Sequence, residues 1–249
     1  MRPDRDLRFA FLIEPPFCYR TSDGAVTGCD VEVARHVIRQ IGDGAFVPVE
    51  TEFAELLPGL ADGRWDMTTG MFITDERRRA ADFSRPIWAM PDGLLVHAGN
   101  PHGIAGYSSI VQKAGLRLGI VRDQVQHSTA LRLGVSEDHI RAFDTYAEAA
   151  EAVAAGTIDA YASVAMAHRG YLERDTAGRL ALVEVPANEK MAEPGAFAFA
   201  KGRSALRAMV DDALARFLGS VDHRALMARF GFTPEEVDPM TSVPGRSSR

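Results

Sequence analysis

The sequence predicts an α/β protein of two lobes, each built on a largely parallel sheet. Strand and helix patterns alternate from residue 7 to residue 72, and a similar alternation begins again near residue 116. Two segments rich in Pro, Gly and Asn, at 91–100 and about 187–196, are the natural crossovers between these runs. Because parallel strands joined by helices place ligand sites at their carboxyl ends, function is expected in the loops after residues 13, 51 and 70.

The first run contains three strands. An apolar strand over 7–13 precedes a hairpin around Asp23-Gly24, a dipeptide typical of two-residue turns. A helix is expected from Asp30, as its N-cap, to Gly42, because apolar residues recur there at helical spacing. A strand, a short helix and a strand follow, over 45–53, 54–63 and 65–72.

The second run repeats this pattern. Its strands are expected over 116–121, 140–144 and 158–164, and its helices over 126–134 and 145–156. Thr145 and Gly156 flank the second of these helices and are typical capping residues. After an apolar segment at 195–201, two amphipathic helices are expected over 204–220 and 222–231.

Composition limits the admissible functions. The chain has 249 residues, 46% hydrophobic and 25% charged, with a net charge of −6, as in an ordinary soluble protein without a nucleic-acid partner. No apolar window reaches the ~18 residues of a membrane span. The first residues lack the apolar core of a leader, so the protein is cytoplasmic if this start is genuine and periplasmic if a leader is missing from it. The polar tail at 241–249 is expected to be frayed.

The cysteines and histidines give weaker signals. If Asp23-Gly24 forms a two-residue turn, Cys18 lies opposite Cys29, which would permit a disulfide in an oxidising compartment. The seven His residues show no metal-ligand spacing, and His127 is expected at the surface. We therefore expect neither a metal nor a cofactor.

Six blocks carry a family resemblance: "PPFCYRTSDGAVTGCDVEVARHV", "TEFAELLPGLADGRWDM", "GMFITDERRRAADFSRPIW", "LLVHAGNP", "FDTYAEAAEAVAAGTIDAYA" and "GAFAFAKGRSALRAMVDDAL". Together they resemble the bilobal solute-binding proteins of polar amino-acid ABC importers. The resemblance implies a two-lobed fold of type II with two crossovers, in which 1–95 and 192–249 form lobe 1 and 96–191 form lobe 2. It also implies a monomer that closes on a small ligand and presents it to an ABC permease.

Arg77 matches the Arg of the "IT-x-x-R" motif, which holds the ligand carboxylate in the amino-acid binders of this family. Two other positions and one loop depart from those proteins. Phe72 stands where they usually have Thr or Ser, and Val164 stands where they usually have the Asp that holds the ligand ammonium. Their "GTT" loop is replaced by "DQV" at 123–125. The resemblance therefore implies a ligand whose cation is of a different kind.

An aromatic box is the expected replacement. Phe17, Phe53 and Phe72 follow the three strands of the first run, and aromatic faces attract delocalised, poorly hydrated cations. A single Phe at a strand end is more often part of the core, and only the joint placement beside Arg77 favours a pocket. The set resembles the site of ectoine and hydroxyectoine binders. The expected ligand-binding residues are Glu14, Phe17, Phe53, Gly70, Phe72 and Arg77, with the backbone N–H groups of Val125 and Gln126.

Three classes of function fit this sequence. The first is a transport receptor for a small zwitterion, ectoine or hydroxyectoine above all, with a polar or cationic amino acid as the alternative. The second is an enzyme similar to cyclohexadienyl dehydratases, for which Glu14 is the only evident acid. The third is a ligand sensor module. We favour the receptor, and we expect no enzyme.

Overall fold

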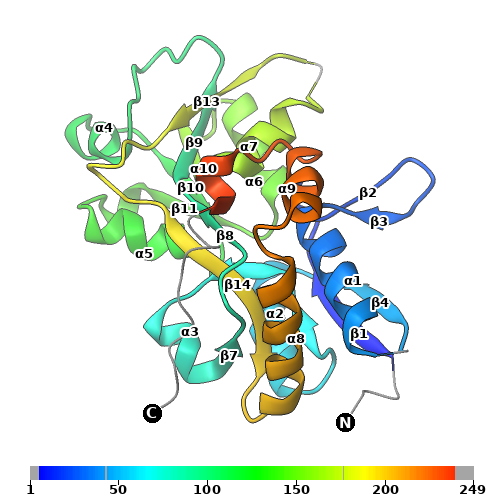
Figure 1. Cartoon of the computed structure of the whole chain (residues 1–249). Coiled ribbons are helices and arrows are strands. Elements are labelled where there is room, and N and C mark those ends of the chain that lie inside the picture. Colours follow the sequence, from blue (N-terminus) through cyan, green and yellow to red (C-terminus); the bar gives the residue numbers. More distant parts are fainter. Residues whose placement is uncertain (1–5, 43, 176, 239–249) are drawn as a thin grey trace.

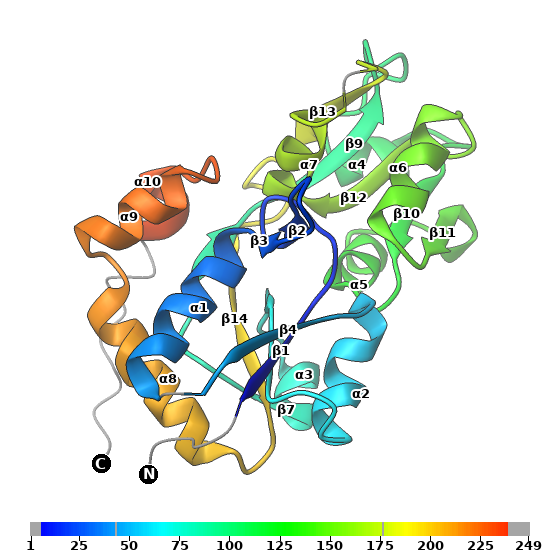
Figure 2. The same cartoon turned by 90° about the vertical axis from the view of Figure 1, so that its right-hand side faces the viewer.

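Two sheets of mainly parallel strands, one in each half of the molecule, form the centres of two lobes (Figures 1 and 2). This computed structural model describes residues 6–42, 44–175 and 177–238, so the predicted frayed tail lies outside the described residues. The first sheet has the order β4-β1-β5 and consists of β1 (Leu7–Phe11), β4 (Phe46–Glu50) and β5 (Met67–Thr68). The predicted α/β class with two lobes is confirmed.

The second sheet has five strands in the order β11-β10-β12-β9-β13. Strands β10, β11 and β12 are parallel, while β9 and β13 are antiparallel to their neighbours. Their bounds are β9 (Asp92–His97), β10 (Leu118–Val121), β11 (Ile140–Phe143), β12 (Ala160–Val164) and β13 (Leu180–Glu184). The segment 91–100, expected as a crossover, also contains β9, a buried inner strand of this sheet that the sequence analysis did not predict.

The strand predicted over 65–72 is divided in two. β5 pairs with β1 in parallel, whereas β6 (Gly70–Phe72) pairs antiparallel with the long strand β14 (Glu193–Ala200). β14 also pairs with β7 (Ala81–Phe83) and β8 (Trp88–Met90). The chain changes sheets at Thr69, so Phe72 is not at the end of a parallel strand as expected. The lobe boundaries at 95/96 and 191/192 stay a prediction.

Helices cover the sheets of both lobes (Figure 1). They are α1 (Cys29–Ile41), α2 (Leu56–Ala61), α3 (Asp75–Ala80), α4 (Tyr107–Gln112), α5 (Val125–Arg132), α6 (Tyr146–Ala154), α7 (Ala165–Leu172), α8 (Ser204–Phe217), α9 (Val221–Ala228) and α10 (Pro234–Val237), with 3-10 turns η1 (Phe53–Glu55) and η2 (Glu137–His139). Thr145 caps α6 in a reciprocal bond with Glu148, as its position predicts. Among the described residues, no helix is long and apolar enough to cross a membrane.

The start of α1 differs from the prediction. Gly28, with φ of 129°, is the N-cap, and Asp30 is the second helical residue. A side chain at Gly28 would collide with the Phe17 carbonyl, because an added Cβ would lie 2.1 Å from that oxygen. The Asp30 carboxylate therefore does not cap the helix, and it accepts hydrogen bonds from the neighbouring sheet instead.

The hairpin β2 (Tyr19–Arg20) and β3 (Val26–Thr27) is present, but its predicted register is wrong by one residue. Tyr19 pairs with Thr27, and the loop closes with a hydrogen bond from the Thr21 N–H to the Ala25 carbonyl. Gly24 takes the left-handed position, with φ of 86°, as in three-residue loops. The two cysteines are therefore not directly opposed, and both thiols are free.

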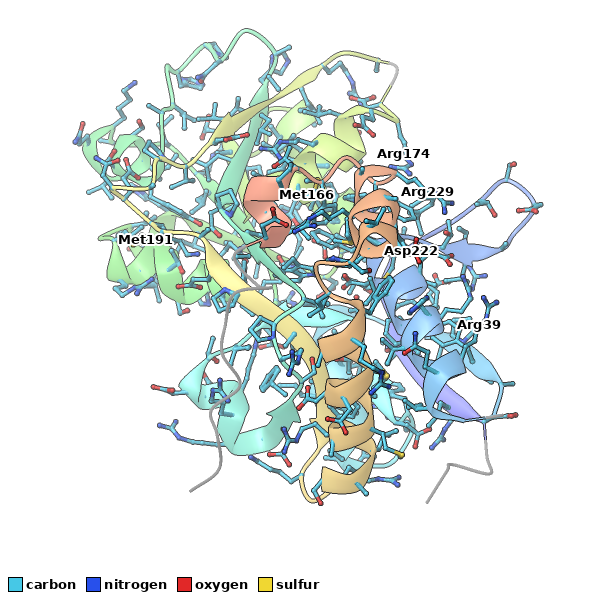
Figure 3. The ribbon with its side chains drawn as sticks, viewed as in Figure 1. Arg39, Met166, Arg174, Met191, Asp222 and Arg229 are labelled. Carbon is cyan, nitrogen blue, oxygen red and sulfur yellow. The ribbon has the colours of Figure 1, made fainter. Side chains whose placement is uncertain are left out.

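The lobes touch beside the hairpin. Gly170 of α7 lies against the loop after β1, and an added Cβ would be 2.6 Å from the Pro15 carbonyl oxygen. Arg174, labelled in Figure 3, follows α7 in the chain. Its guanidinium lies 4.2 Å from the centroid of the Tyr19 ring. The absence of a side chain at Gly170 thus permits close approach of the two lobes.

Replacing Gly170 by Ala should open the molecule. The added methyl group meets backbone atoms of Pro15, which cannot move aside as a flexible side chain could. We expect small-angle scattering of the ligand-free variant to give a larger radius of gyration than that of the wild type. Glu173→Ala, an exposed change just after the same helix, is the matched control and should leave the curve unchanged. Identical curves for Gly170→Ala and the wild type would contradict this role.

Candidate functional site

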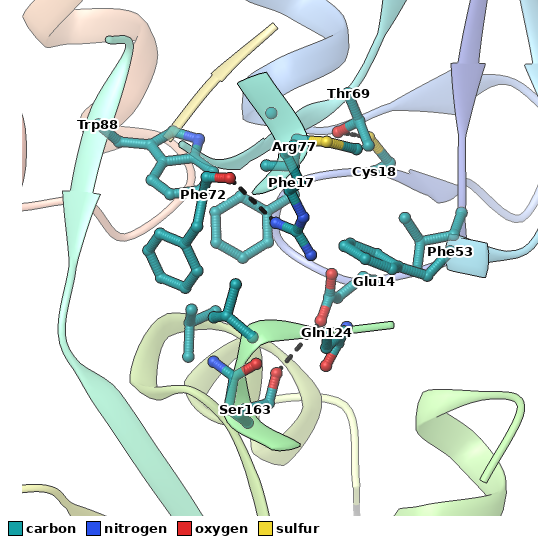
Figure 4. Close-up of a pocket in the computed structure, with 16 residues that line it drawn as sticks. Glu14, Phe17, Cys18, Phe53, Thr69, Phe72, Arg77, Trp88, Gln124 and Ser163 are labelled. Carbon is teal, nitrogen blue, oxygen red and sulfur yellow. Dashed lines mark hydrogen bonds between the residues drawn. The ribbon is translucent and has the colours of Figure 1, made fainter. Parts of the chain in front are cut away.

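A cavity between the two lobes collects every predicted ligand-binding residue (Figure 4). It encloses about 460 Å³ of space not filled by atoms, part of it open to solvent. The eight predicted residues are Glu14, Phe17, Phe53, Gly70, Phe72, Arg77, Val125 and Gln126, and all of them line it. Eight further residues complete the wall: Leu12, Cys18, Thr69, Met71, Trp88, Gln124, Ser163 and Val164. That a ligand binds here stays a prediction.

The aromatic side of the cavity contains a ring that the sequence analysis missed. Trp88 packs against Phe17 at 5.5 Å and meets Phe72 edge to face at 5.6 Å between ring centroids. With Phe53, these rings give four aromatic walls. Trp88 comes from β8, which pairs with β14, so the rule that selected the ends of parallel strands could not find it.

Two glycines without side chains leave room for the Trp88 indole. A Cβ added to Gly195 of β14 would lie 2.0 Å from the indole, and one added to Gly70 would lie 2.9 Å from it. The indole N–H donates to Asp30 Oδ1 at 3.0 Å. Two glycines and one carboxylate thus fix the orientation of this ring.

Arg77 is held at the lobe boundary by its own helix and by two carbonyl groups. The Thr74 hydroxyl caps α3 by accepting from the Arg77 N–H. The guanidinium donates to the Phe72 carbonyl at 3.0 Å and, across the cleft, to the Asp123 carbonyl at 2.6 Å. It lies 5.1 Å from the centroid of the Phe53 ring. Burial lowers the pKa of Arg77 to about 10, so it stays cationic at neutral pH and keeps further N–H donors for an anion.

Glu14 is the acid of the cavity. Its Oε1 accepts from the Ser163 hydroxyl of the opposite lobe at 3.4 Å (Figure 4). Burial raises the pKa of Glu14 to about 7, although hydrogen bonds with Ser163 and Gln124 act in the opposite direction. A cation placed in the cavity would favour the ionised carboxylate, because an opposite charge lowers the pKa of an acid.

The second lobe contributes mainly the start of α5. Gln124 is the N-cap of this helix, and the backbone N–H groups of Val125 and Gln126 belong to its first turn, where no intrahelical acceptor exists. Asp123, just before it, has φ of 61° in the left-handed region and gives its carbonyl to Arg77. Val164 also lines the cavity and offers no charge to a ligand. His127 lies outside this lining and bonds with Glu137.

A buried ion pair connects the cavity to the strands that join the lobes. The Lys190 ammonium lies 3.2 Å from Asp92 Oδ1 and 5.1 Å from the centroid of the Phe72 ring. The Gln126 amide donates to the same Asp92 oxygen at 3.1 Å, and the Tyr107 hydroxyl donates to the other at 2.7 Å. We call Asp92, Lys190, Gln126 and Tyr107 the hinge network. Gln126 therefore belongs both to this network and to the cavity wall, and Phe72 of the wall lies against Lys190.

Among the residues that the structure describes, no group of three or more His, Cys, Asp or Glu could hold a metal ion. The thiols of Cys18 and Cys29 bond with Thr69 and Asp30, at 3.2 Å and 3.6 Å.

Two lobes around one cavity define a binding protein for a small solute, with the type II fold of periplasmic binding proteins. The chain belongs to the bacterial extracellular solute-binding proteins, family 3, which it matches over residues 7–233. Membership implies a small ligand and an interaction with ABC permease components.

Individual relatives point in more than one direction. A probable amino-acid ABC transporter periplasmic-binding protein, y4tE, from Sinorhizobium fredii is 29% identical over 98% of this chain and 81% of its own. The crystal structure of EhuB in complex with hydroxyectoine is 25% identical, has a TM-score of 0.83, and covers 96% of this chain and 95% of its own. A cyclohexadienyl dehydratase from Pseudomonas aeruginosa is 39% identical over 72 residues, 28% of this chain and 26% of its own.

The pKa of Glu14 predicts that pH controls closure of the ligand-free protein. A raised pKa means that the closed form favours the protonated acid, so this contribution to closure is complete below the ordinary value of 4.5 and is lost as pH rises through about 7. We expect the radius of gyration of the ligand-free protein to increase from pH 5 to pH 8. Glu14→Gln should remain closed at both values. An equal increase in this variant, or none in the wild type, would contradict the assignment.

Proposed function

We propose that this protein captures a compact zwitterion with a delocalised cation, ectoine or hydroxyectoine, between its closing lobes. The observation that carries the proposal is the convergence of four aromatic rings, one acid and one arginine on a single interlobe cavity. In the proposed pose, the cation lies among Phe17, Phe53, Phe72 and Trp88 near Glu14. The carboxylate lies toward Arg77 and the start of α5.

The charges of the cavity suit such a ligand. A cyclic amidinium spreads its charge over two nitrogens, so it gains from ring faces at ~0.5–2 kcal/mol per ring and is desolvated easily. Arg77 offers a planar donor that never loses its charge at neutral pH, as a carboxylate requires.

An amino acid is the second candidate, because y4tE is a probable amino-acid binding protein. The cavity argues against it at two positions. Phe72 brings no hydroxyl for the α-amino or carboxylate group, and Val164 brings no acid for the ammonium. A localised, strongly hydrated ammonium would have only Glu14 as a charged partner in the cavity wall.

Family membership supports the remaining parts of the proposal, to which we add a monomeric state and the absence of a cofactor. The protein acts in the periplasm as a monomer, delivers its ligand to the membrane subunits of an ABC importer, and needs no cofactor. It is not an enzyme, because Glu14 is the only titratable acid in the cavity wall and Ser163 and Gln124 already bond with it. A sensor role would require a signalling domain.

A thermal-shift screen tests the proposal directly. Ectoine, hydroxyectoine, glutamine, histidine and arginine are compared at equal concentrations, because a ligand that binds only the folded state raises its stability by RT ln(1 + [L]/Kd). We expect the two ectoines to give the largest shifts, followed by calorimetry to obtain affinities. A larger shift with any of the amino acids would overturn the proposed ligand and favour the second candidate.

Changing Phe72 to Leu should weaken ectoine binding while the fold persists. The substitution removes the aromatic face but keeps most of the apolar volume, so we expect a loss of about 1 kcal/mol or more in binding free energy. Phe9→Leu is the matched control, since Phe9 is fully buried, packs edge to face on Phe197 at 6.0 Å and does not line the cavity. Calorimetry and melting temperature are measured on both. Equal affinities for Phe72→Leu and Phe9→Leu would show that Phe72 is only core.

A further inference from the structure

A buried carboxylate lies directly behind the cavity wall. The Asp30 side chain is only 1% exposed and accepts hydrogen bonds from the Thr69 hydroxyl at 2.7 Å, the Gly70 N–H at 2.7 Å and the Trp88 indole N–H at 3.0 Å. Among the residues that the structure describes, no Lys, Arg or His forms an ion pair with it. Burial raises the pKa of Asp30, whereas the hydrogen bonds from Thr69, Gly70 and Trp88 favour its ionised form. Buried carboxylates are usually paired with a cation, so one that is held by neutral donors calls for an explanation.

All three of its donors in the sheets are members of the cavity wall. Thr69, Gly70 and Trp88 each line the cavity, whereas Asp30 does not. The charge therefore lies one hydrogen bond away from the space that a ligand would fill. Burial is the main cause of the raised pKa of Glu14, and the negative charge of Asp30 adds a smaller contribution in the same direction.

We propose that Asp30 is a specificity-determining residue for the ligand cation, acting from behind the wall through the Trp88 indole. The inference rests on the proposed function, in which the ligand carries a delocalised cation. A carboxylate that accepts the indole N–H polarises the ring system and makes its face more attractive to a cation. In a poorly solvated site this effect is screened less than it would be in water.

The position of Asp30 also selects the kind of cation. Because the carboxylate is sealed behind Thr69, Gly70 and Trp88, no ligand atom can bond to it directly. A localised ammonium depends on direct hydrogen bonds from its three donors, and it would gain little here. A cation spread over a planar group gains from the polarised ring and from the potential, so the arrangement favours amidinium-like or guanidinium-like groups.

A purely structural role is the competing explanation. Asp30 lies in the first turn of α1, where a negative charge is favourable to the helix, and it holds β6 and β8 together through its hydrogen bonds. Such a role would affect stability and the binding of every ligand alike. A role in cation recognition would affect only ligands that carry the cation.

The experiment compares Asp30→Asn with the wild type in calorimetry against ectoine. We expect the variant to bind about tenfold more weakly, within the range measured for ring-cation attraction. Pyroglutamate, a cyclic carboxylate without a cation, is measured by displacement of ectoine, and its affinity should change less than twofold. Asp66→Asn is the matched control, because Asp66 is a buried acid beside Arg8 at the opposite end of β1 and outside the cavity. This control should bind ectoine like the wild type.

A second variant keeps the proposal testable if Asp30→Asn folds poorly. Trp88→Phe retains a ring but removes the N–H that reaches Asp30, and it should lose severalfold in ectoine affinity. In the Trp88→Phe background, Asp30→Asn should cause a smaller further loss, because the two residues act as a unit. Unchanged ectoine affinity in Asp30→Asn or Trp88→Phe, or equal losses for ectoine and pyroglutamate, would overturn the proposal. Failure of the wild type to bind ectoine would instead overturn the proposed function.

Discussion

The hydrogen bonds that the Arg77 guanidinium donates to both lobes are the interaction on which the closed arrangement depends. The guanidinium donates to the Phe72 carbonyl in one lobe and to the Asp123 carbonyl in the other, while its plane lies near the Phe53 ring. Among the described residues this buried cation forms no ion pair, and its hydrogen bonds go to neutral carbonyls, so it contributes a positive potential to the cavity. The same group can therefore join the lobes and attract an anion.

The negative and positive charges of the cavity lie at opposite ends of the ligand in the proposed pose. Glu14 and the hidden Asp30 give one end a negative potential, and Arg77 with the start of α5 gives the other a positive one. Each charge is costly when the cavity is empty, as the shifted pKa values of Glu14 and Arg77 indicate. A zwitterion of matching polarity relieves both costs at once, which neither a simple cation nor a simple anion can do.

Much of this site could be predicted from the sequence, because the residues that follow parallel strands share one edge of a sheet. Glu14 and Phe17 follow β1, Phe53 follows β4, and all three reach the cavity. Trp88 and Lys190 could not be found in this way. Trp88 belongs to β8, which pairs antiparallel with β14, more than 90 residues away in the chain. Lys190, which contacts Phe72, belongs to a segment that the sequence analysis assigned as a crossover. Asp30 was wrongly predicted to be the N-cap of α1, because an acid before an apolar helical pattern is the usual N-cap signal. Its carboxylate accepts tertiary hydrogen bonds instead. The hairpin register failed for a local reason, as Gly24 supports a loop longer by one residue.

The hinge network links the joint between the lobes to the cavity wall. Lys190 touches Phe72, and Gln126 bonds with Asp92, so the joint between the lobes is built from neighbours of the wall and includes one wall residue. A substitution at Lys190 alters the balance between open and closed forms, and the apparent affinity scales with the fraction of molecules competent to bind. In the proposed function, selectivity depends on the rings and charges of the wall and on Asp30 behind it, whereas Lys190 acts on binding strength through closure. A lineage that moves between scarce and abundant supplies of one solute can thus recalibrate its receptor without redesigning what it recognises.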